Sequence, residues 1–350
     1  MLLIFSDDQG MGDVSCYGGD IPTPNIDSIA ADGVKFTQFY AASSICTPSR
    51  YGLLTGRFAH RSRDQLTGAL MFMSASHRDR GIRNGEQTYV SELNEAGYST
   101  HLVGKWHLGH GDKAFWPTAH GFDSFYGHTG GCVDFFTCRY GSIPDWYRNE
   151  KLIHPVGYAT DLITKEALSI LAQTAGSVER PAATDRSRVR RTPWYLHVSY
   201  NAPHFGKGWD ALSGEPVNVM QPKPSDLVQV QVDGTQIRKD YAAKVIGMDR
   251  SIGQLLSALD RTGQSNNTIV IFMSDHGATQ EYGGDNGGLR GAKATLFEGG
   301  IRVPCVVRWP KVIEAGTISN AVASALDWYP TLARVTGTKG SKSNLDGQLI

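Results

Sequence analysis

Met1-Leu2-Leu3-Ile4-Phe5-Ser6-Asp7-Asp8 opens the chain with a short apolar run that leads directly into two adjacent carboxylates. The apolar run predicts a β-strand, and similar runs recur at residues 101–103, 194–199, 268–273 and 303–307. Helical patterns alternate with these runs. The sequence therefore predicts an α/β fold, in which a large, mostly parallel mixed sheet is sandwiched by helices.

Two helices are clear in the pattern, and one stretch has no pattern. Residues 239–261 carry apolar side chains with the 3.6-residue period of a helix, and Gly263 marks its end. Residues 88–96 form a second predicted helix, which Gly97 stops. Residues 172–192 are rich in Ala, Ser, Thr and Arg without periodicity, so we interpret them as a surface insertion loop.

Length and composition exclude several classes of partner. The chain has 350 residues, and its 34 basic and 34 acidic residues balance, so no global charge points to nucleic acid. No apolar run approaches membrane-spanning length, so we expect no membrane partner. No linker divides the chain, which predicts a single domain over residues 1–350. The five cysteines fit no zinc pattern, and Cys132 and Cys138 could form a local disulfide or remain free thiols.

Charged and imidazole side chains follow four of the predicted strands. They are Asp7 and Asp8 after the first strand, Lys105 and His107 after residues 101–103, His204 after residues 194–199, and Asp275 and His276 after residues 268–273. The carboxyl ends of the strands in an open α/β sheet share one crevice, which is the usual ligand site of such folds. We therefore expect these side chains to share one site.

Three of these residues, Asp7, Asp8 and Asp275, would bring carboxylates close together. Without a cation they would repel one another and their pKa values would rise, whereas a divalent metal removes the conflict. Three carboxylates with at most one imidazole suit Ca²⁺ or Mg²⁺ better than zinc. The alternative is that Asp7 and Asp8 cap a helix or a turn, which does not explain the matching position of Asp275.

The pentapeptide Cys46-Thr47-Pro48-Ser49-Arg50 reads as a strand-to-helix turn. Thr47 is a suitable N-cap and Pro48 suits the first helical position, with Gly56 as the stop. Cys46 would then face the positive end of a short helix, an anion-binding position that holds a nucleophile. The alternative is a buried structural cysteine.

Positive charge converges on the same region. Arg50, Lys105 and Lys293 would surround the nucleophile together with the metal, which describes a site for a tetrahedral oxyanion such as sulfate or phosphate. His107 and His204 become candidates for proton transfer, although a single histidine is more often a structural hydrogen-bonding residue.

These motifs resemble the type I, formylglycine-dependent sulfatases of the alkaline phosphatase superfamily. The resemblance covers nearly the whole chain. It rests on Cys46-Thr47-Pro48-Ser49-Arg50, Thr55-Gly56-Arg57, Gly104-Lys105-Trp106-His107-Leu108-Gly109, Asn201-Ala202-Pro203-His204, Ser274-Asp275-His276-Gly277, Phe297-Glu298-Gly299-Gly300-Ile301-Arg302-Val303-Pro304 and Asp327-Trp328-Tyr329-Pro330-Thr331.

The resemblance implies a modified nucleophile. A formylglycine-generating enzyme would oxidise Cys46 to formylglycine, reading Pro48 and Arg50 as part of its signal. In the hydrated aldehyde one hydroxyl attacks sulfur, and the other then drives the elimination of sulfate, so no water has to attack a hindered ester.

The resemblance also implies a role for each remaining site residue. Asp7, Asp8, Asp275 and His276 would hold the metal, usually Ca²⁺ in this family, with an oxygen of the residue at Cys46. Many members have Asn at the position of His276. The other roles are as follows: Arg50 steadies the formylglycine, Lys105 and Lys293 bind sulfate oxygens, His107 assists elimination, and His204 protonates the leaving alcohol.

The ends of the chain depart from the family pattern. Members usually carry a signal peptide, whereas no leader precedes Met1 here, so we expect a periplasmic or extracellular protein with its targeting segment outside this sequence, or a cytoplasmic one. A C-terminal subdomain that closes the substrate cleft is also expected to be missing, and the chain is expected to be truncated at both ends.

The expected activity is that of an arylsulfatase-like sulfuric ester hydrolase acting on a sulfated carbohydrate. Residues 126–137 resemble the substrate-side loop of glycan-acting members. One alternative is a phosphonate or phosphodiester hydrolase on the same scaffold. The other is an unmodified, non-catalytic homologue that binds sulfated glycans. A cysteine phosphatase is disfavoured, because its motif spaces Cys and Arg by five residues and needs no metal.

Overall fold

The computed structural model describes residues 1–176, 178–179, 190–338 and 344–350. A ten-stranded mixed sheet forms its centre. Across the sheet the strands are β16 (Thr317–Ser324), β2 (Val34–Tyr40), β15 (Cys305–Arg308), β14 (Val270–Ser274), β1 (Leu2–Asp7), β11 (Trp194–Pro203), β3 (Ser99–Lys105), β4 (Ser124–His128), β7 (Tyr147–Arg148) and β8 (Lys151–Leu152).

Four of the five strands expected from the sequence lie side by side and run parallel. β1 pairs with β14 on one side and β11 on the other, and β11 pairs with β3. The fifth expected strand is β15, which is antiparallel to both of its neighbours. The carboxyl ends of β14, β1, β11 and β3 therefore meet at one edge of the sheet.

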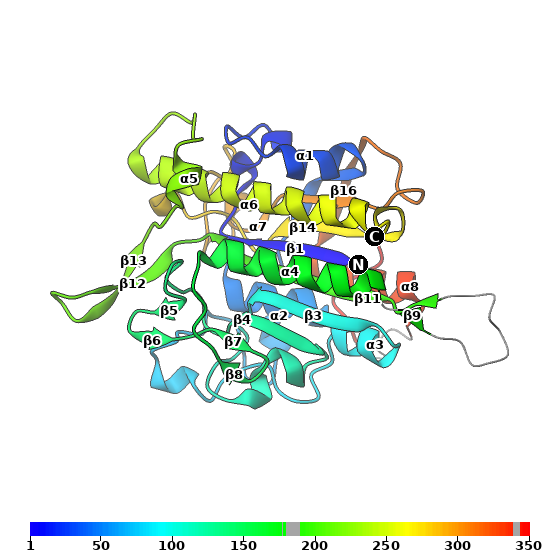
Figure 1. Cartoon of the computed structure of the whole chain (residues 1–350), viewed down its shortest axis with the longest axis horizontal. Helices are drawn as coiled ribbons and strands as arrows, with labels where there is room; N and C mark the ends of the chain where they lie inside the picture. The colour runs from blue at the N-terminus through cyan, green and yellow to red at the C-terminus, as the bar shows by residue number, and fades with distance from the viewer. Residues whose placement is uncertain (177, 180–189, 339–343) are drawn as a thin grey trace.

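Helices cover both faces of the sheet. The longer ones are α1 (Pro24–Ala31), α2 (Cys46–Thr55), α3 (Tyr89–Glu95), α4 (Ala159–Gly176), α6 (Gln236–Arg261) and α8 (Trp328–Thr336), and α5 (Pro224–Leu227) and α7 (Glu298–Ile301) are single turns. Leu2 and Ile4 of β1 pack in one core with α1, α4 and α6, whereas Leu3 and Phe5 pack on the other face with α2, α3 and α8. In Figure 1, α1, α4 and α6 lie in front of the sheet. The predicted α/β sandwich is confirmed.

The two periodic helices form, with small shifts at their ends. α6 begins at Gln236, earlier than expected, because the Thr235 side chain caps it by accepting a hydrogen bond from the Arg238 amide. In α3 the Thr88 side chain caps the helix at the Ser91 amide. Both helices therefore start at a hydroxyl that satisfies an otherwise unpaired amide.

The start of α2 differs from the prediction. The helix begins at Cys46, with Ile45 as its N-cap, so Thr47 is not the cap and Pro48 is the third helical residue. The Thr47 hydroxyl bonds neighbouring loops instead, as described below. The predicted stop is confirmed, because Gly56 adopts a left-handed conformation with φ of 63°.

The predicted insertion loop is partly helical. Residues 172–176 extend α4, because Ala and Gln favour helix and Thr174 packs inside. β9 (Val178–Glu179) and β10 (Arg190–Arg191) then form a short antiparallel ladder. The rest of the predicted loop lies outside the described residues.

Two further hairpins lie beyond the main sheet: β5 (Arg139–Tyr140) with β6 (Ile143–Pro144), and β12 (Gly206–Asp210) with β13 (Glu215–Val219). All five cysteines are free thiols, including Cys132 and Cys138. Among the described helices, none combines the length and the apolar character needed to cross a membrane.

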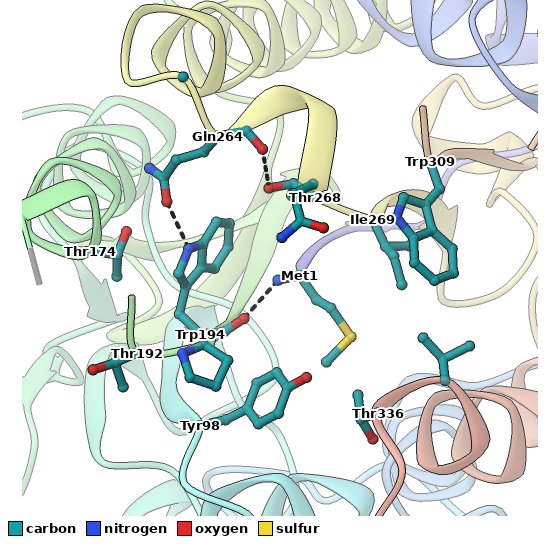
Figure 2. A pocket seen from close by; sticks show the side chains of 14 residues that line it. Met1, Tyr98, Thr174, Thr192, Trp194, Gln264, Thr268, Ile269, Trp309 and Thr336 are labelled. Atoms are coloured by element: carbon teal, nitrogen blue, oxygen red, sulfur yellow. Dashed lines mark hydrogen bonds between the residues drawn. The ribbon is translucent and has the colours of Figure 1, made fainter. Parts of the chain in front are cut away.

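A cavity of about 500 Å³ lies at the sheet edge where β1 and β11 begin. Figure 2 shows the Met1 amine donating to the Trp194 carbonyl (2.6 Å) and the Trp194 indole N–H donating to Gln264 (2.8 Å) beside it. The ten predicted site residues are at the other end of the strands, and none of them lines this cavity.

Candidate active site

The predicted side chains lie together at the carboxyl ends of the four parallel strands. Asp7 and Lys105 are the last residues of β1 and β3, His204 follows β11, and Asp275 follows β14. Cys46 reaches the same point from the first turn of α2. Its Sγ lies 3.2 Å from Nε2 of His276 and 3.8 Å from Oδ1 of Asp7. The predicted convergence is therefore present in the fold.

The donor atoms form two overlapping groups that could hold one cation. In each group the ligand atoms lie within 4.8 Å of one another and every residue is buried. The groups are Asp7, Asp8, Cys46 and His204, and Asp7, Cys46, Asp275 and His276. Across the two groups the donors are three carboxylates, two imidazoles and the Cys46 thiol, and the three carboxylates suit a hard divalent cation.

Asp8 takes its place through an unusual backbone conformation. Its φ is 63°, in the left-handed region that residues other than glycine rarely adopt. Its amide donates to Oδ1 of Asp275 (3.1 Å), and the Tyr241 hydroxyl donates to its carbonyl (2.8 Å). Thr279 donates to its carboxylate (3.2 Å). Backbone strain at a site this well held is characteristic of functional residues.

Cations neutralise the buried carboxylates. The Lys105 ammonium lies 2.5 Å from Asp7, and the Lys293 ammonium lies 2.6 Å from Asp8. Burial alone would raise the pKa of Asp7, but Lys105 and the other nearby cations hold that pKa well below its usual range. For Asp275 burial and the charge of Asp7 prevail, and the pKa rises to about 7.

Arg50 ties α2 to the strand ends. Its guanidinium donates to Asp275 (3.1 Å) and to the Ser199 hydroxyl (2.7 Å), and it lies over the Phe5 ring at 5.0 Å. Ser49 donates to the Asp275 carbonyl. These bonds fix the first turn of α2, and with it the position of the Cys46 side chain.

The Cys46 thiol lies in a strongly electropositive environment. Burial would raise its pKa, but Lys105, Lys293 and His276 hold that pKa well below the usual range of a thiol. The predicted placement of this sulfur at a cationic site is therefore observed. The same charges would attract an anionic substrate.

His107 is held rigidly beside this cluster. Its φ is 62°, its Nε2 lies 2.9 Å from the Leu70 carbonyl, and its carbonyl accepts from the Thr47 hydroxyl (3.0 Å). The same hydroxyl accepts from the Leu70 amide (3.1 Å). Nδ1 of His107 is buried without a hydrogen-bond partner, and burial lowers the pKa of the ring.

His204 lies close to Asp8. Its Nε2 is 3.6 Å from Oδ2 of Asp8, and its Nδ1 is 2.8 Å from the Phe205 carbonyl. Burial lowers the pKa of the ring to about 4. The buried Lys244 of α6 donates to the His204 carbonyl and lies 3.5 Å from the centre of the Phe135 ring.

Sequence reasoning did not identify four residues that support this site: Ser199, Tyr241, Lys244 and Thr279. Tyr241 and Lys244 lie on α6, and the helical period assigned Tyr241 to the core without a role for its hydroxyl. A lysine on the buried stretch of an amphipathic helix is a usable signal, since a buried cation needs a specific partner. Ser199 carried a weaker signal, a hydroxyl in an apolar strand.

The fold and this cluster agree with the comparisons to known proteins. The family model described as Sulfatase matches residues 1–338, so the chain belongs to the sulfatase family. It is 32% identical to human steryl-sulfatase, over 96% of this chain and 66% of that protein, and 33% identical to mouse N-acetylgalactosamine-6-sulfatase, over 97% and 62%.

A solved structure gives the same picture. The crystal structure of Ps i-CgsB in complex with k-i-k-neocarrahexaose matches with a TM-score of 0.85 and 31% identity, over 99% of this chain and 74% of that one. The chain spans about two thirds or less of the length of the curated relatives given above. The family resemblance read from the sequence is thus confirmed.

Proposed function

We propose that this protein hydrolyses sulfate monoesters, with a sulfated carbohydrate as its substrate. A formylglycine derived from Cys46 and one divalent cation would serve the reaction. The observation that carries the proposal is the buried position of Cys46 Sγ among Asp7, Asp275 and His276, with lysine ammonium groups around it. A nucleophile, a cation site and fixed positive charge in one buried place suit a tetrahedral oxyanion.

Lys105 and Lys293 would bind and orient the sulfate, and Arg50 would steady the modified residue. Lys105 and Lys293 now pair with the carboxylates of Asp7 and Asp8, so their ammonium groups face the same small volume. Fixed cations in a buried site cost no reorganisation when negative charge develops. Arg50 would hold the modified residue in position through its bonds to Asp275 and Ser199.

Asp7, Asp8, Asp275 and His276 would hold the metal, and we propose Ca²⁺ because carboxylate oxygens form most of the donor set. The ion would supply positive charge against the sulfate oxygens. The formylglycine would supply a hydrated aldehyde as nucleophile, whose second hydroxyl allows sulfate to leave by elimination. Conversion of Cys46 to formylglycine would require a formylglycine-generating enzyme as a partner in maturation.

The two histidines would move protons. We assign His204 to protonation of the leaving alcohol, since its Nε2 lies 3.6 Å from Asp8 and the ring reaches the possible cation site. An anionic sulfate beside the ring would favour the protonated imidazole. His107 would assist elimination, and its Nδ1 has no other partner in the described structure.

Two kinds of relative support a carbohydrate substrate. One relative is named N-acetylgalactosamine-6-sulfatase, and the neighbouring structure is in complex with k-i-k-neocarrahexaose. Steryl-sulfatase is equally similar in sequence, so a steryl sulfate belongs in the substrate panel. Periplasmic or extracellular location remains a prediction from the family pattern.

The test is a comparison of kcat/KM for an aryl sulfate and an aryl phosphodiester, with mass spectrometry of the peptide that contains Cys46. We expect formylglycine at Cys46 and a preference for the sulfate. A preference for the phosphodiester would identify a phosphonate or phosphodiester hydrolase instead. The protein would be produced together with the modifying enzyme. If Cys46 were still unmodified and no substrate were turned over, the result would support a non-catalytic protein that binds sulfated glycans.

A further inference from the structure

A lysine next to the proposed active site takes no part in the reaction as derived above. Lys207 lies on β12, three residues beyond His204. The hairpin formed by β12 and β13 projects from the edge of the sheet at which β1 and β11 end (Figure 1). Lys207 therefore lies at the same edge of the sheet as the proposed active site.

The ammonium group of Lys207 is oriented but not neutralised. Nζ donates to Oδ1 of Asn218 (2.7 Å), its cross-strand partner, and lies 5.6 Å from the centre of the Tyr140 ring. Over the described ranges of the chain, no carboxylate lies within ion-pair distance of it. A half-buried ammonium with one neutral acceptor keeps donors free for an anion.

A continuous series of contacts joins this lysine to His204. Asn218 donates through its amide to the Tyr282 hydroxyl (2.8 Å), and Tyr282 packs on Phe205 with 4.4 Å between ring centres. Phe205 packs on His204 at 4.0 Å. Lys207 and His204 thus belong to the same packed group of side chains.

The loop that follows β4 joins the two regions from the other side. A Cβ added at Gly206, the residue before Lys207, would lie 3.2 Å from the carbonyl of Val133, which follows Cys132 in this loop. The neighbouring Gly131 lies against the His107 ring, which a Cβ at Gly131 would approach to 2.7 Å. The loop after β4 therefore contacts His107, and in the β5–β6 hairpin that follows it the Gly141 amide donates to the Lys207 carbonyl (2.9 Å).

An aromatic surface lies beside the free charge. Trp209 is two residues beyond Lys207 and so lies on the same side of β12, where it is 46% exposed. It packs near Gly141, at the tip of the β5–β6 hairpin. An exposed indole next to a cation offers an apolar face for a sugar ring and a charge for a substituent of that ring.

We propose that Lys207 and Trp209 form a second subsite, which binds an anionic group on a sugar adjacent to the one that carries the reacting sulfate. The substrate class is then an oligosaccharide with at least two anionic groups, the second being a sulfate or a carboxylate. This inference rests on the proposed function, since it names the part of the substrate that the hydrolytic site does not contact.

The test compares Lys207→Met and the wild-type protein on three substrates: a singly sulfated disaccharide, a disulfated one, and a sulfated one with a uronate carboxylate. A charge-assisted contact at a half-buried site is worth roughly a five- to tenfold change in KM. We expect KM for a doubly anionic substrate to rise at least fivefold more than KM for the singly sulfated one. The affected substrate identifies the second group as sulfate or carboxylate.

Two controls make the result specific. Lys311→Met removes a lysine that follows β15 at the opposite edge of the sheet and should not change the ratio of KM values. Trp209→Ala should weaken all three disaccharides relative to an aryl sulfate. An equal effect of Lys207→Met on all three substrates, or no effect on any, would overturn the subsite.

Failure of the proposed sulfatase activity would give a different result from failure of the subsite. It would give no sulfate release from any substrate by the wild-type protein. Binding would then be measured by calorimetry with the disulfated disaccharide, before and after Lys207→Met. A fivefold or larger loss of affinity would support the subsite without hydrolysis, and unchanged affinity would overturn it.

Discussion

Replacing Arg50 with Met should destabilise the protein strongly, because Arg50 is a buried counter-charge. Its guanidinium bonds Asp275 and the Ser199 hydroxyl and lies 3.7 Å from the carboxylate of Asp7. Its side chain is only 4% exposed, and those of Asp7 and Asp275 are fully buried. Met fills a similar volume but leaves both carboxylates without this partner.

Breaking a buried ion pair by removing one partner costs about 3–5 kcal/mol. At about 2 °C per kcal/mol, the lower end of the range for large domains, the Tm should fall by roughly 6–10 °C. The assay is thermal unfolding in the presence of a chelator, so that no added cation compensates the carboxylates. Arg50→Lys keeps the charge and should recover part of the loss, but not all of it, because lysine cannot make the same divergent hydrogen bonds.

Arg61→Met is the matched control. Arg61 pairs with Asp346 at 2.6 Å, but both side chains are partly exposed, at 27% and 23%. A pair of that kind is worth at most about 1 kcal/mol. Equal losses for Arg50→Met and Arg61→Met would refute the reasoning, because they would show that burial of the Arg50 pair adds nothing to its contribution.

Three further predictions concern the chemistry. Cys46→Ala should lower kcat by several orders of magnitude. Cys16→Ala, which removes a half-buried thiol outside the site, should leave kcat unchanged. Substantial residual turnover by Cys46→Ala would exclude Cys46 as the nucleophile. A chelator should abolish activity and lower the Tm, and Ca²⁺ should restore both, whereas recovery with zinc alone would show that the ion was assigned wrongly. His204→Ala should slow a sugar sulfate about 10²–10⁴-fold and an activated aryl sulfate much less, because the poorer leaving group needs the proton more. Equal losses in kcat on both substrates would move the proton donor elsewhere, with His107 as the next candidate.

The centre of the fold could be predicted because its strands are buried on both faces. The apolar runs of β14, β1, β11 and β3 are visible in the sequence, and each ends in polar side chains. Their shared edge follows from parallel pairing, which brings carboxyl ends together. The ten predicted site residues came from that rule and from the family motifs, and the structure gathers them.

The edges of the sheet gave no comparable signal. β16 is mostly exposed, and β7 and β8 are two residues long, so none of them carries a continuous apolar run. Pairing with neighbours far away in the sequence creates such strands, and local propensity does not determine it.

The start of α2 could not be predicted either, because the partners of one residue are far away in the sequence. Thr47 has the side chain of a good cap, but its hydroxyl bonds both the Leu70 amide and the His107 carbonyl. Those partners lie 23 and 60 residues away, so no local rule could weigh them against the cap. Lys207 and its partner Asn218 were missed for a related reason, since a short exposed hairpin has no distinctive pattern.

The burial of α2 determines when Cys46 could be modified relative to folding. All ten residues of this helix are buried in the folded chain, including Cys46 and the two residues, Pro48 and Arg50, of the proposed recognition signal. If Cys46 is oxidised as proposed, the enzyme must reach it while the segment is still unfolded, before the rest of the chain packs around α2. A chain that folds first would be trapped as a stable, correctly shaped but inert molecule. The yield of folded protein and the yield of active protein would then differ, because the active fraction depends on the rate of Cys46 oxidation relative to the rate of folding.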